Sequence, residues 1–407
     1  MKANTNESNH GLSPARLKNV DAYLQRIVDQ GKVAGAGGMI IRHDAEAYCS
    51  SFGMRDLAGK APLKNDSIYR IYSMSKTFTV VAAMTLYEKG FFILRQPIAD
   101  FLPAFKDMMV AEHDEKGIVT LVPAKGPVTF EHLFTMTSGI PYPEEGSYSG
   151  RLMAELSEKS ARDAAKGKPW NTARTVDEAA KVPLCFHPGE HWMYGFSHDI
   201  LGRLIEVISG KSLGEYLSET IFKPLGLKDT AFFVPKKKQN RVVKPYSLGP
   251  GGLKELTDLH DDPASPHPPA FESGGGGLCS TMADCACYAQ MLLHQGRPGT
   301  PAERILSRKT VELIRTKHCV PTEMSSKVFT HLGGYGYGLG VRTMLDTARA
   351  GLNGSVGEWA WDGMLGTYYC VDPAEDLTAL FFIQLKSEIN SDLQRGFVQT
   401  VYSAIDD

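Results

Sequence analysis

The chain has 407 residues, 43% of them hydrophobic, and a formal net charge of −2. This composition is that of an ordinary globular protein, and the length allows a large core, which we expect to be divided between two subdomains. The near-neutral charge gives no reason to expect binding to nucleic acid or to an anionic membrane, and no apolar run is long enough to span a bilayer.

The cysteines and the first residues indicate a cytoplasmic protein. Seven cysteines are scattered along the chain, an odd number that favours reduced thiols. The stretch from Met1 to Gly11 is polar and lacks the apolar core of a signal peptide. Cys285 and Cys287 have no second cysteine pair to complete a zinc site, so we expect no metal, and we expect no cofactor. The sequence carries no signal of oligomeric state.

The N-terminal part predicts a helix followed by a hairpin. Ser13 and Pro14 form a favourable helix start, and an apolar face then repeats as far as Gly31. The segments Gly37 to Arg42 and Ala45 to Gly53 are typical of two strands joined by a tight turn.

The stretch around Ser73 is the strongest candidate for chemistry. It contains the only Ser-x-x-Lys pattern, Ser73 to Lys76, at the start of a mostly apolar run that stops at Gly90. In a helix the two side chains share one face of the first turn. A lysine in a low-dielectric site loses proton affinity and can act as base for a serine nucleophile. The alternative is a serine N-cap followed by a surface lysine, but the helix is apolar nearly all round and is therefore predicted to be buried.

The middle of the chain is predicted to be mainly helical. A helix is expected from Thr129 to Met136, and a second long helix follows Tyr194 and ends at Gly210. Ser212 begins another helix, with Glu215 completing a capping box.

Several polar or glycine-rich segments separate these helices. The stretch 143–181 is expected to be an excursion with some helix, and Lys236 to Lys244 a solvated basic loop. A Gly/Pro-rich loop is expected from Gly249 to Pro269. Gly274 to Gly277 is interpreted as a tight turn and not a phosphate cradle, because no Lys-Ser/Thr pair follows it.

The last third predicts a helix and then mostly strands. Strands at both ends of the sequence, with helices between them, indicate an α+β fold in which one antiparallel sheet is built from both termini and flanked by helices. We expect an α/β domain from 1–72 and 272–407, with a mainly helical domain, 73–271, inserted between them. The predicted C-terminal elements are a helix at Met282 to Leu293, strands at Gly336 to Arg342, Glu358 to Trp361, Thr367 to Val371 and Thr378 to Gln384, and a last helix containing Leu393 to Ile405.

Two patterns resemble catalytic motifs but lie in the wrong context. The Gly-x-Ser-x-Gly pattern around Ser212 would need a preceding strand, and a helix precedes it. His187, Glu190 and His191 spell an inverted zinc-protease motif, but a Pro-Gly pair between the histidines breaks the helix that they would share.

A second proton-transfer group is expected at Tyr194, which lies among aromatic residues just before a long helix. A phenol beside a lysine ammonium is expected to have a lowered pKa and to exchange protons with Ser73. The alternative is ordinary aromatic packing in the core.

With these residues in place, the chain resembles the serine β-lactamase and penicillin-binding-protein superfamily. Its class C β-lactamase-like branch, which includes the family VIII carboxylesterases, fits best. The resemblance implies a β-lactamase/transpeptidase-like fold with the active site between the sheet and the all-helical domain. It also implies Ser73 as the acylated nucleophile, Lys76 as its proton partner and Tyr194 as the general base. The resembling segments are 53–76, 133–141, 188–202, 276–293 and 357–384.

The chain departs from the lactamase pattern at two motifs. Phe196 replaces the Asn of Tyr-x-Asn, and Trp361-Asp362-Gly363 replaces Lys-Thr-Gly. Trp361 removes a cation that would meet a substrate carboxylate, and Asp362 adds a negative charge nearby. Both departures favour neutral esters over penicillins. The resemblance places the oxyanion hole at the backbone N–H groups of Ser73 and Met364, and the substrate-binding residues are expected to be Trp361, Asp362, Gly363, Phe196 and Trp192.

The sequence therefore predicts a serine carboxylesterase that forms an acyl-enzyme on Ser73 and acts on small-molecule, neutral, short-chain carboxylic esters. An acyltransferase of the same architecture is the first alternative, because residues 192–195 resemble the tyrosine region of the statin acyltransferase. A β-lactamase or D-amino-acid peptidase is disfavoured because no signal peptide is expected. A non-catalytic binding protein on the same scaffold is disfavoured because all three catalytic candidates are present.

Overall fold

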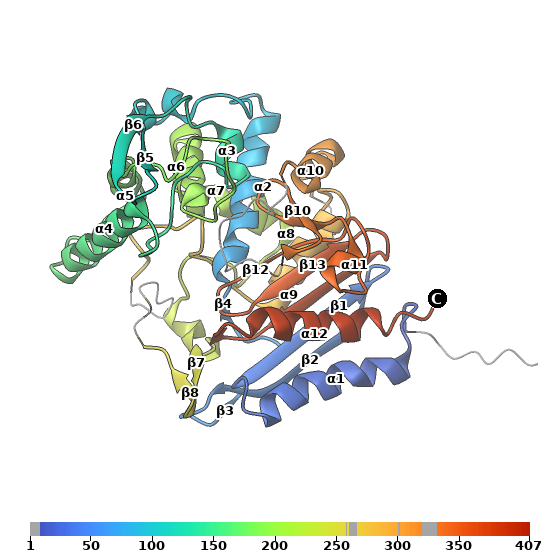
Figure 1. Ribbon diagram of the computed structural model, residues 1–407. Helices are drawn as coiled ribbons and strands as arrows, with labels where there is room; N and C mark the ends of the chain where they lie inside the picture. The colour runs from blue at the N-terminus through green and yellow to red at the C-terminus, as the bar shows by residue number, and fades with distance from the viewer. Residues whose placement is uncertain (1–8, 258, 260–266, 300–301, 320–331) are drawn as a thin grey trace, which may run out of the picture.

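An eight-stranded antiparallel sheet organises one side of the molecule (Figure 1). The computed structural model describes residues 9–257, 259, 267–299, 302–319 and 332–407. The strands follow the spatial order β10-β11-β12-β13-β14-β1-β2-β3, so both ends of the chain contribute to one sheet. The bounds are β1 Gly35–Arg42, β2 Ala45–Asp56, β3 Ala61–Pro62, β10 Tyr335–Tyr337, β11 Arg342–Met344, β12 Trp359–Asp362, β13 Tyr368–Asp372 and β14 Leu377–Phe382.

The hairpin of β1 and β2 forms where the sequence predicts it. Its turn holds His43 at φ 52° and Asp44 at φ 62°. Two successive residues in the left-handed region give the tight turn whose twist matches that of the flanking strands. On its other edge β1 pairs with β14, with Ile40 opposite Ala379. The N-terminal hairpin is thereby joined to the C-terminal strands.

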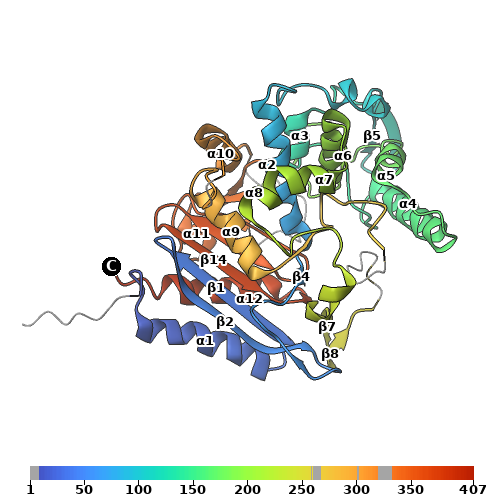
Figure 2. The same ribbon diagram turned by 180° about the vertical axis from the view of Figure 1, so that it is seen from behind.

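Helices cover both faces of the sheet (Figures 1 and 2). Helices α1, Pro14–Asp29, and α12, Asn390–Tyr402, lie side by side on one face, and α9, Met282–Leu293, lies on the other. Phe381 of β14 stacks on Phe397 of α12 with ring centroids 5.2 Å apart. Because helices cover both faces, β13 and β14 are buried along their whole length.

The middle of the chain forms a group of helices beside the sheet (Figure 1). At its centre is α2, Ser75–Glu88, in which every residue from Ser75 to Leu86 is buried. The prediction of a central buried helix is confirmed, and α2 packs against α6. The other helices of this part are α3 Phe130–Phe134, α4 Tyr148–Ala165, α5 Thr172–Ala179, α6 Ser197–Ser209, α7 Leu213–Leu217 and α8 Lys223–Leu225. Two short helices, α10 Arg308–Arg315 and α11 Thr347–Ala350, belong to the C-terminal part of the chain.

Short elements account for most differences from the predicted structure. The segment 336–342, expected as one strand, holds the end of β10 and the start of β11, which pair with each other. The predicted loop from Gly249 contains β8, and its residues 258 and 260–266 lie outside the described residues. Such strands are too short to show alternating polarity in the sequence. The remaining strands are β4 Tyr69–Arg70, β5 Met109–His113, β6 Val119–Pro123, β7 Tyr246–Gly249, β8 Gly252–Glu255, β9 Cys279–Ser280 and β15 Leu385–Lys386.

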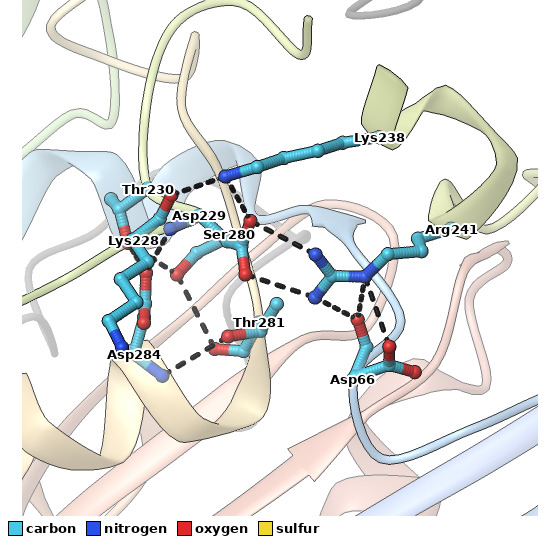
Figure 3. Close-up of polar contacts among 9 residues, drawn as sticks. All are labelled: Asp66, Lys228, Asp229, Thr230, Lys238, Arg241, Ser280, Thr281 and Asp284. Carbon is cyan, nitrogen blue, oxygen red and sulfur yellow. Dashed lines mark hydrogen bonds and ion pairs between the residues drawn. The ribbon is translucent and has the colours of Figure 1, made fainter. Parts of the chain in front are cut away.

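The basic segment 236–244 is not simply a solvated loop (Figure 3). Arg241 donates two hydrogen bonds to Asp229, at 3.0 and 3.1 Å, and Lys238 lies 2.7 Å from the same carboxylate. Arg241 also donates to the backbone oxygen of Asp66. The three charged side chains are only 14–27% exposed. The expectation of a freely solvated segment is wrong because Asp229 and the backbone of Asp66 pair with these side chains once the chain is folded.

The predicted fold class is confirmed: helices and an antiparallel sheet combine in a β-lactamase/transpeptidase-like arrangement. The proposed division into 1–72 with 272–407 and 73–271 stays a prediction. Residues 1–8 of the polar N-terminus lie outside the described residues. In the described ranges, no helix has both the length and the apolar character needed to cross a membrane.

Candidate active site

Ser73 lies in a short 3₁₀ turn, Tyr72–Met74, that leads directly into α2. The residue before it, Tyr72, has φ 41°, a left-handed conformation that an aromatic residue rarely adopts. Such a conformation costs about 1–3 kcal/mol and persists only where the surrounding structure enforces it. The backbone is therefore strained immediately before the candidate nucleophile, a feature typical of functional sites.

Lys76 is fully buried and contacts three oxygen atoms. Its Nζ lies 3.2 Å from Ser73 Oγ, 2.9 Å from the Tyr142 hydroxyl and 2.6 Å from the backbone oxygen of Gly275. Burial lowers the pKa of Lys76 to about 7, and the negative charges of Asp199 and Asp362 oppose this shift. A substantial fraction of Lys76 is therefore a neutral amine at neutral pH, as a base for Ser73 requires.

These contacts suit both protonation states of Lys76. The ammonium can donate to all three oxygens, whereas the neutral amine has two donors and one lone pair. The Gly275 carbonyl accepts in either state. The Ser73 hydroxyl can instead donate its proton to the lone pair, so proton transfer needs no rearrangement of the surrounding groups.

Asp199 of α6 holds the turn that contacts Lys76. Its Oδ1 accepts hydrogen bonds from Ser273 Oγ at 2.5 Å and from the Gly275 N–H at 3.1 Å. A Cβ on Gly275 would lie 2.4 Å from Asp199 Oδ2 and 2.8 Å from the Tyr142 hydroxyl. The turn at 274–277, interpreted from sequence only as a tight turn, thus needs glycine because it packs against the candidate site.

Tyr194 completes the group around Ser73. The Lys76 Nζ lies 4.6 Å from the centre of the Tyr194 ring, and the Trp361 indole N–H donates to the Tyr194 hydroxyl at 3.4 Å. Burial raises the pKa of Tyr194, while hydrogen bonds to Ser73 and Trp361 partly oppose the shift. The expected lowering of this pKa is wrong because burial, which raises the pKa of the phenol, is the largest influence on it.

Three aromatic residues predicted to bind substrate surround the two tyrosines. Trp192 stacks on Tyr194 with ring centres 6.2 Å apart, and Trp361 lies 5.6 Å from the same ring. Phe196 meets the Tyr142 ring edge to face at 6.3 Å. Trp192 and Trp361 are 3% and 1% exposed, so their rings support Tyr194 and offer little surface to a substrate. Phe196, 8% exposed, also borders a cavity.

The end of β12 brings the third predicted motif to the site. Asp362 forms an ion pair with the buried Arg342 at 2.5 Å. Asp362 brings a carboxylate to the site as expected, but the guanidinium of Arg342 compensates its charge. The Gly363 N–H donates to Thr367 O at 2.7 Å, which closes the turn toward β13. Met364, whose N–H is the predicted second oxyanion donor, is 46% exposed.

The close approach of this turn to the serine segment depends on Gly363. A Cβ there would lie 2.4 Å from both Ile71 O and Thr367 Oγ1. Thr367 in turn donates to Ile71 O at 3.3 Å. The β12–β13 turn and the backbone leading to Ser73 are therefore packed together, which is the arrangement that two oxyanion donors from these segments require.

Ser212 and His187, whose motifs resembled catalytic ones in the sequence, do not belong to the group of residues around Ser73. Ser212 Oγ accepts from the Glu215 N–H, and the capping box predicted for α7 is present. His187 contacts Glu112 at 3.0 Å and accepts from the Lys125 N–H, in a segment without helix.

Sequence reasoning missed Tyr142, Asp199 and Gly275. Tyr142 is brought beside Tyr194 by a bridge between Pro141 and Gly195, a long-range pairing that no local pattern reveals. Asp199 had a detectable signal, since an acidic residue in the first turn of a mostly apolar helix calls for a specific partner.

Comparisons with known proteins identify the family and the fold of the chain. The sequence model of a family described as Beta-lactamase matches residues 20–399. Protein Rv1367c of Mycobacterium tuberculosis is 30% identical over 383 residues, which cover 91% of this chain and 90% of that protein. Esterase EstB of Burkholderia gladioli is 25% identical over 378 residues, covering 89% and 88%. The solved structure of EstCE1, described as a hydrolase with promiscuous acyltransferase activity, has a TM-score of 0.80 at 21% identity and covers 95% and 98%.

Proposed function

Because the chain belongs to the β-lactamase family, we propose that it is a serine carboxylesterase that forms an acyl-enzyme on Ser73 and hydrolyses neutral carboxylic esters. The family and its esterase relative EstB support a serine hydrolase in general. The observation that carries the proposal is the buried Lys76, whose pKa is lowered to about 7 and whose amine lies 3.2 Å from Ser73 Oγ.

The proposed acylation step uses the neutral amine of Lys76 as base. Lys76 takes the Ser73 proton while Oγ attacks the ester carbonyl carbon. The N–H groups of Ser73 and Met364 stabilise the oxyanion that forms. Tyr194, a phenol at neutral pH because burial raises its pKa, donates its proton to the leaving alkoxide and regains one from Lys76. This order differs from the one implied by the resemblance, in which Tyr194 is the general base.

Deacylation proceeds by the same groups in reverse. A water molecule attacks the acyl carbon, the pair of Tyr194 and Lys76 accepts its proton, and Ser73 Oγ is reprotonated as the acid leaves. No net proton is gained or lost by the protein over the cycle.

The preference for neutral esters follows from the charges at the site. Trp361 stands where the lactamase pattern has a lysine, and Arg342 is already paired with Asp362. A substrate carboxylate would therefore lose its hydration without gaining a cation, whereas a neutral ester has no charge to desolvate.

Replacement of Ser73 tests this proposal. We expect Ser73→Ala to abolish hydrolysis of p-nitrophenyl butyrate and to fold normally, because loss of a hydroxyl at a helix start costs at most about 2 kcal/mol. Ser212→Ala is the matched control, since it removes a serine that caps α7 and should keep full turnover. The assignment fails if Ser73→Ala retains turnover or if only Ser212→Ala loses it.

Transfer of the acyl group to an alcohol is the second candidate function. It shares the acyl-enzyme and differs only in the acceptor, and a cavity beside Tyr142 offers room for an alcohol. Adding an alcohol during turnover of a p-nitrophenyl ester separates the two, because a transferase yields mainly the new ester and a hydrolase mainly the acid.

A further inference from the structure

A cavity of about 670 Å³ adjoins the candidate active site on the side of Tyr142. One wall is a single stripe of α4, in which Met153, Leu156, Ser160 and Ala164 recur at helical spacing. The residues of this stripe beyond Leu156 are all serine or alanine, namely Ser157, Ser160, Ala161 and Ala164. Because these side chains are short, the helix leaves space where leucine or phenylalanine would close it.

Aromatic side chains held by contacts of their own form part of the remaining wall, beside the exposed segment 267–270. Trp170 is 3% exposed, and its indole N–H donates to Asp163 at 2.8 Å. The guanidinium of Arg174 lies 4.4 Å from the centre of the Trp170 ring. The ring centres of Phe271 and Phe196 lie 6.2 Å apart. These aromatic side chains are in place before any ligand binds, which lowers the entropic cost of binding against them.

The lining of the cavity carries no carboxylate, ammonium or guanidinium in the part of the chain that the structure describes. Its polar side chains are hydroxyls of Ser157, Ser160, Thr175 and Tyr142 and the ring of His267. A volume within the usual range for small-molecule sites, lined mainly by apolar groups, fits a neutral hydrocarbon group.

Tyr142 connects the cavity with the reacting groups. Its hydroxyl lies 2.9 Å from Lys76 Nζ, and the residue also forms part of the cavity wall. Gly277, at the end of the turn that contacts Lys76, lines the cavity as well. The cavity therefore shares Tyr142 and the turn that ends at Gly277 with the candidate site.

We propose that this cavity binds a bulky, uncharged, apolar group of the ester substrate, of the size of a naphthyl ring or a decanoyl chain. The inference rests on the proposed esterase function and adds a substrate class to it. The sequence favoured short-chain esters, so the two expectations differ in a way that can be measured. Burying such a group from water improves transition-state binding for each added methylene that the cavity accommodates.

A matched ester series tests the inference on the unmodified protein. The acyl arm compares p-nitrophenyl acetate with p-nitrophenyl decanoate, and the alcohol arm compares phenyl acetate with 2-naphthyl acetate. We expect kcat/KM to rise by at least about tenfold for the bulky member of one arm, and the arm that responds identifies which part of the ester enters the cavity. Equal or lower kcat/KM for the bulky member in both arms overturns the inference.

Filling the cavity from α4 tests its location. Ala161→Trp should lower kcat/KM for the preferred bulky ester at least about tenfold and leave p-nitrophenyl acetate within about twofold. Ala165→Trp adds the same indole at an exposed position of the same helix outside the lining, and should change neither. If Ala161→Trp does not fold, Ser157→Trp serves instead, because Ser157 is exposed and also lines the cavity. An equal loss for small and bulky esters overturns the inference.

A binding measurement separates this inference from the proposed function. In a Ser73→Ala background, calorimetry should detect binding of p-nitrophenyl decanoate or 2-naphthyl acetate, and Ala161→Trp should abolish that binding. If no ester is hydrolysed but this binding pattern appears, the esterase proposal fails and the cavity assignment stands. If esters are hydrolysed but the bulky ester binds equally well with Ala161→Trp, the cavity assignment fails and the esterase proposal stands.

Discussion

Lys76 is the residue on which the proposed chemistry depends. It is fully buried, and the ring of His198, which is also fully buried, has a pKa lowered well below its usual value by burial and by Lys76. His198 is therefore neutral and brings no positive charge near the amine. The opposing charges of Asp199 and Asp362 keep the pKa of Lys76 from falling below about 7.

The pKa of Lys76 predicts a specific pH dependence of stability. Between pH 7 and the ordinary lysine pKa of 10.5, the unfolded chain binds more protons at this position than the folded chain. The free energy of unfolding therefore rises with pH across this window, and the full cost of burying Lys76, about a few kcal/mol, is present below pH 7. Lys76→Met should remove this rise in stability as well as the activity.

Urea unfolding at several pH values between 7 and 10 measures this effect. The control is Lys89→Met, which removes an exposed lysine just after the other end of α2 and should keep the rise. A wild-type slope that survives in Lys76→Met would show that another group causes it.

Tyr142 is expected to position and polarise the amine of Lys76. Tyr142→Phe keeps the ring and the cavity wall but removes the hydroxyl 2.9 Å from Nζ. We expect kcat for p-nitrophenyl butyrate to fall about tenfold or more and the acidic limb of the pH profile to move to lower pH, because the ammonium loses an acceptor. Tyr216→Phe is the control, since it removes a buried hydroxyl bonded to Thr85 outside the site. Equal pH profiles for Tyr142→Phe and wild type would contradict this role.

Among the residues of the candidate site, the sequence identified those that belong to one short motif or to a family pattern. Ser73 and Lys76 share one helix turn, so their spacing alone predicts their proximity. Tyr142 and Gly275 contact Lys76 from segments 66 and 199 residues away in the chain. Those contacts depend on how the elements pack, and no periodicity in the sequence encodes them.

The turn between β12 and β13 is the element that most directly shapes the site. Gly363→Ala would place a methyl group 2.4 Å from Ile71 O, and backbone atoms cannot yield as a flexible side chain does. We expect a loss of about 1–3 kcal/mol in stability and a fall in kcat larger than the change in KM, because the oxyanion donors separate. Thermal unfolding measures the loss of stability, and steady-state kinetics measures the changes in kcat and KM.

Gly251→Ala is the matched control for this substitution, since a Cβ there meets nothing within 4 Å. It should alter neither stability nor turnover appreciably. If Gly363→Ala folds with unchanged kcat, the close packing of this turn against the serine segment is not needed for catalysis.

Long elements were predictable and short ones were not. Helices α1, α2, α6 and α9 carry enough turns to show a period and a clear end, such as Gly210 in left-handed conformation after α6. Strands β10 and β11 have three residues each, and their pairing depends on neighbours in the sheet. The ion pairs that fix Arg241 and Lys238 likewise depend on tertiary contacts with Asp229 (Figure 3).

For the whole molecule, the balance of charge at the site predicts substrate preference. We expect kcat/KM for p-nitrophenyl butyrate to exceed that for benzylpenicillin by at least about a hundredfold, the equivalent of about 3 kcal/mol. The physical reason is that Trp361 replaces the lysine that would pair with the penicillin carboxylate, while Arg342 is held by Asp362. Parallel assays under one set of conditions measure the ratio. A penicillin that is the better substrate would mean that another cation serves the carboxylate.

The overall fold was predictable because the strand patterns at both ends of the chain and the helix patterns in the middle indicate the same architecture. Strands at both termini and helices in the middle indicate one sheet with a helical insertion, and the pairing of β1 with β14 closes it. The cavity beside Tyr142 was not predictable, because the serine and alanine residues of α4 do not reveal in sequence which segments face them. Their significance appears once Trp170 and Phe271 are seen to form the facing walls.

Covalent labelling of Ser73 tests the central claim most directly. A neutral p-nitrophenyl phosphonate ester reacts with an activated serine and stops at a stable adduct, so its position is read by mass spectrometry of peptides. The account predicts a single adduct on the peptide that contains Ser73, with loss of esterase activity in parallel, and no adduct in Ser73→Ala. An adduct on another residue that accompanies loss of activity, or full labelling of Ser73 with activity retained, would contradict it.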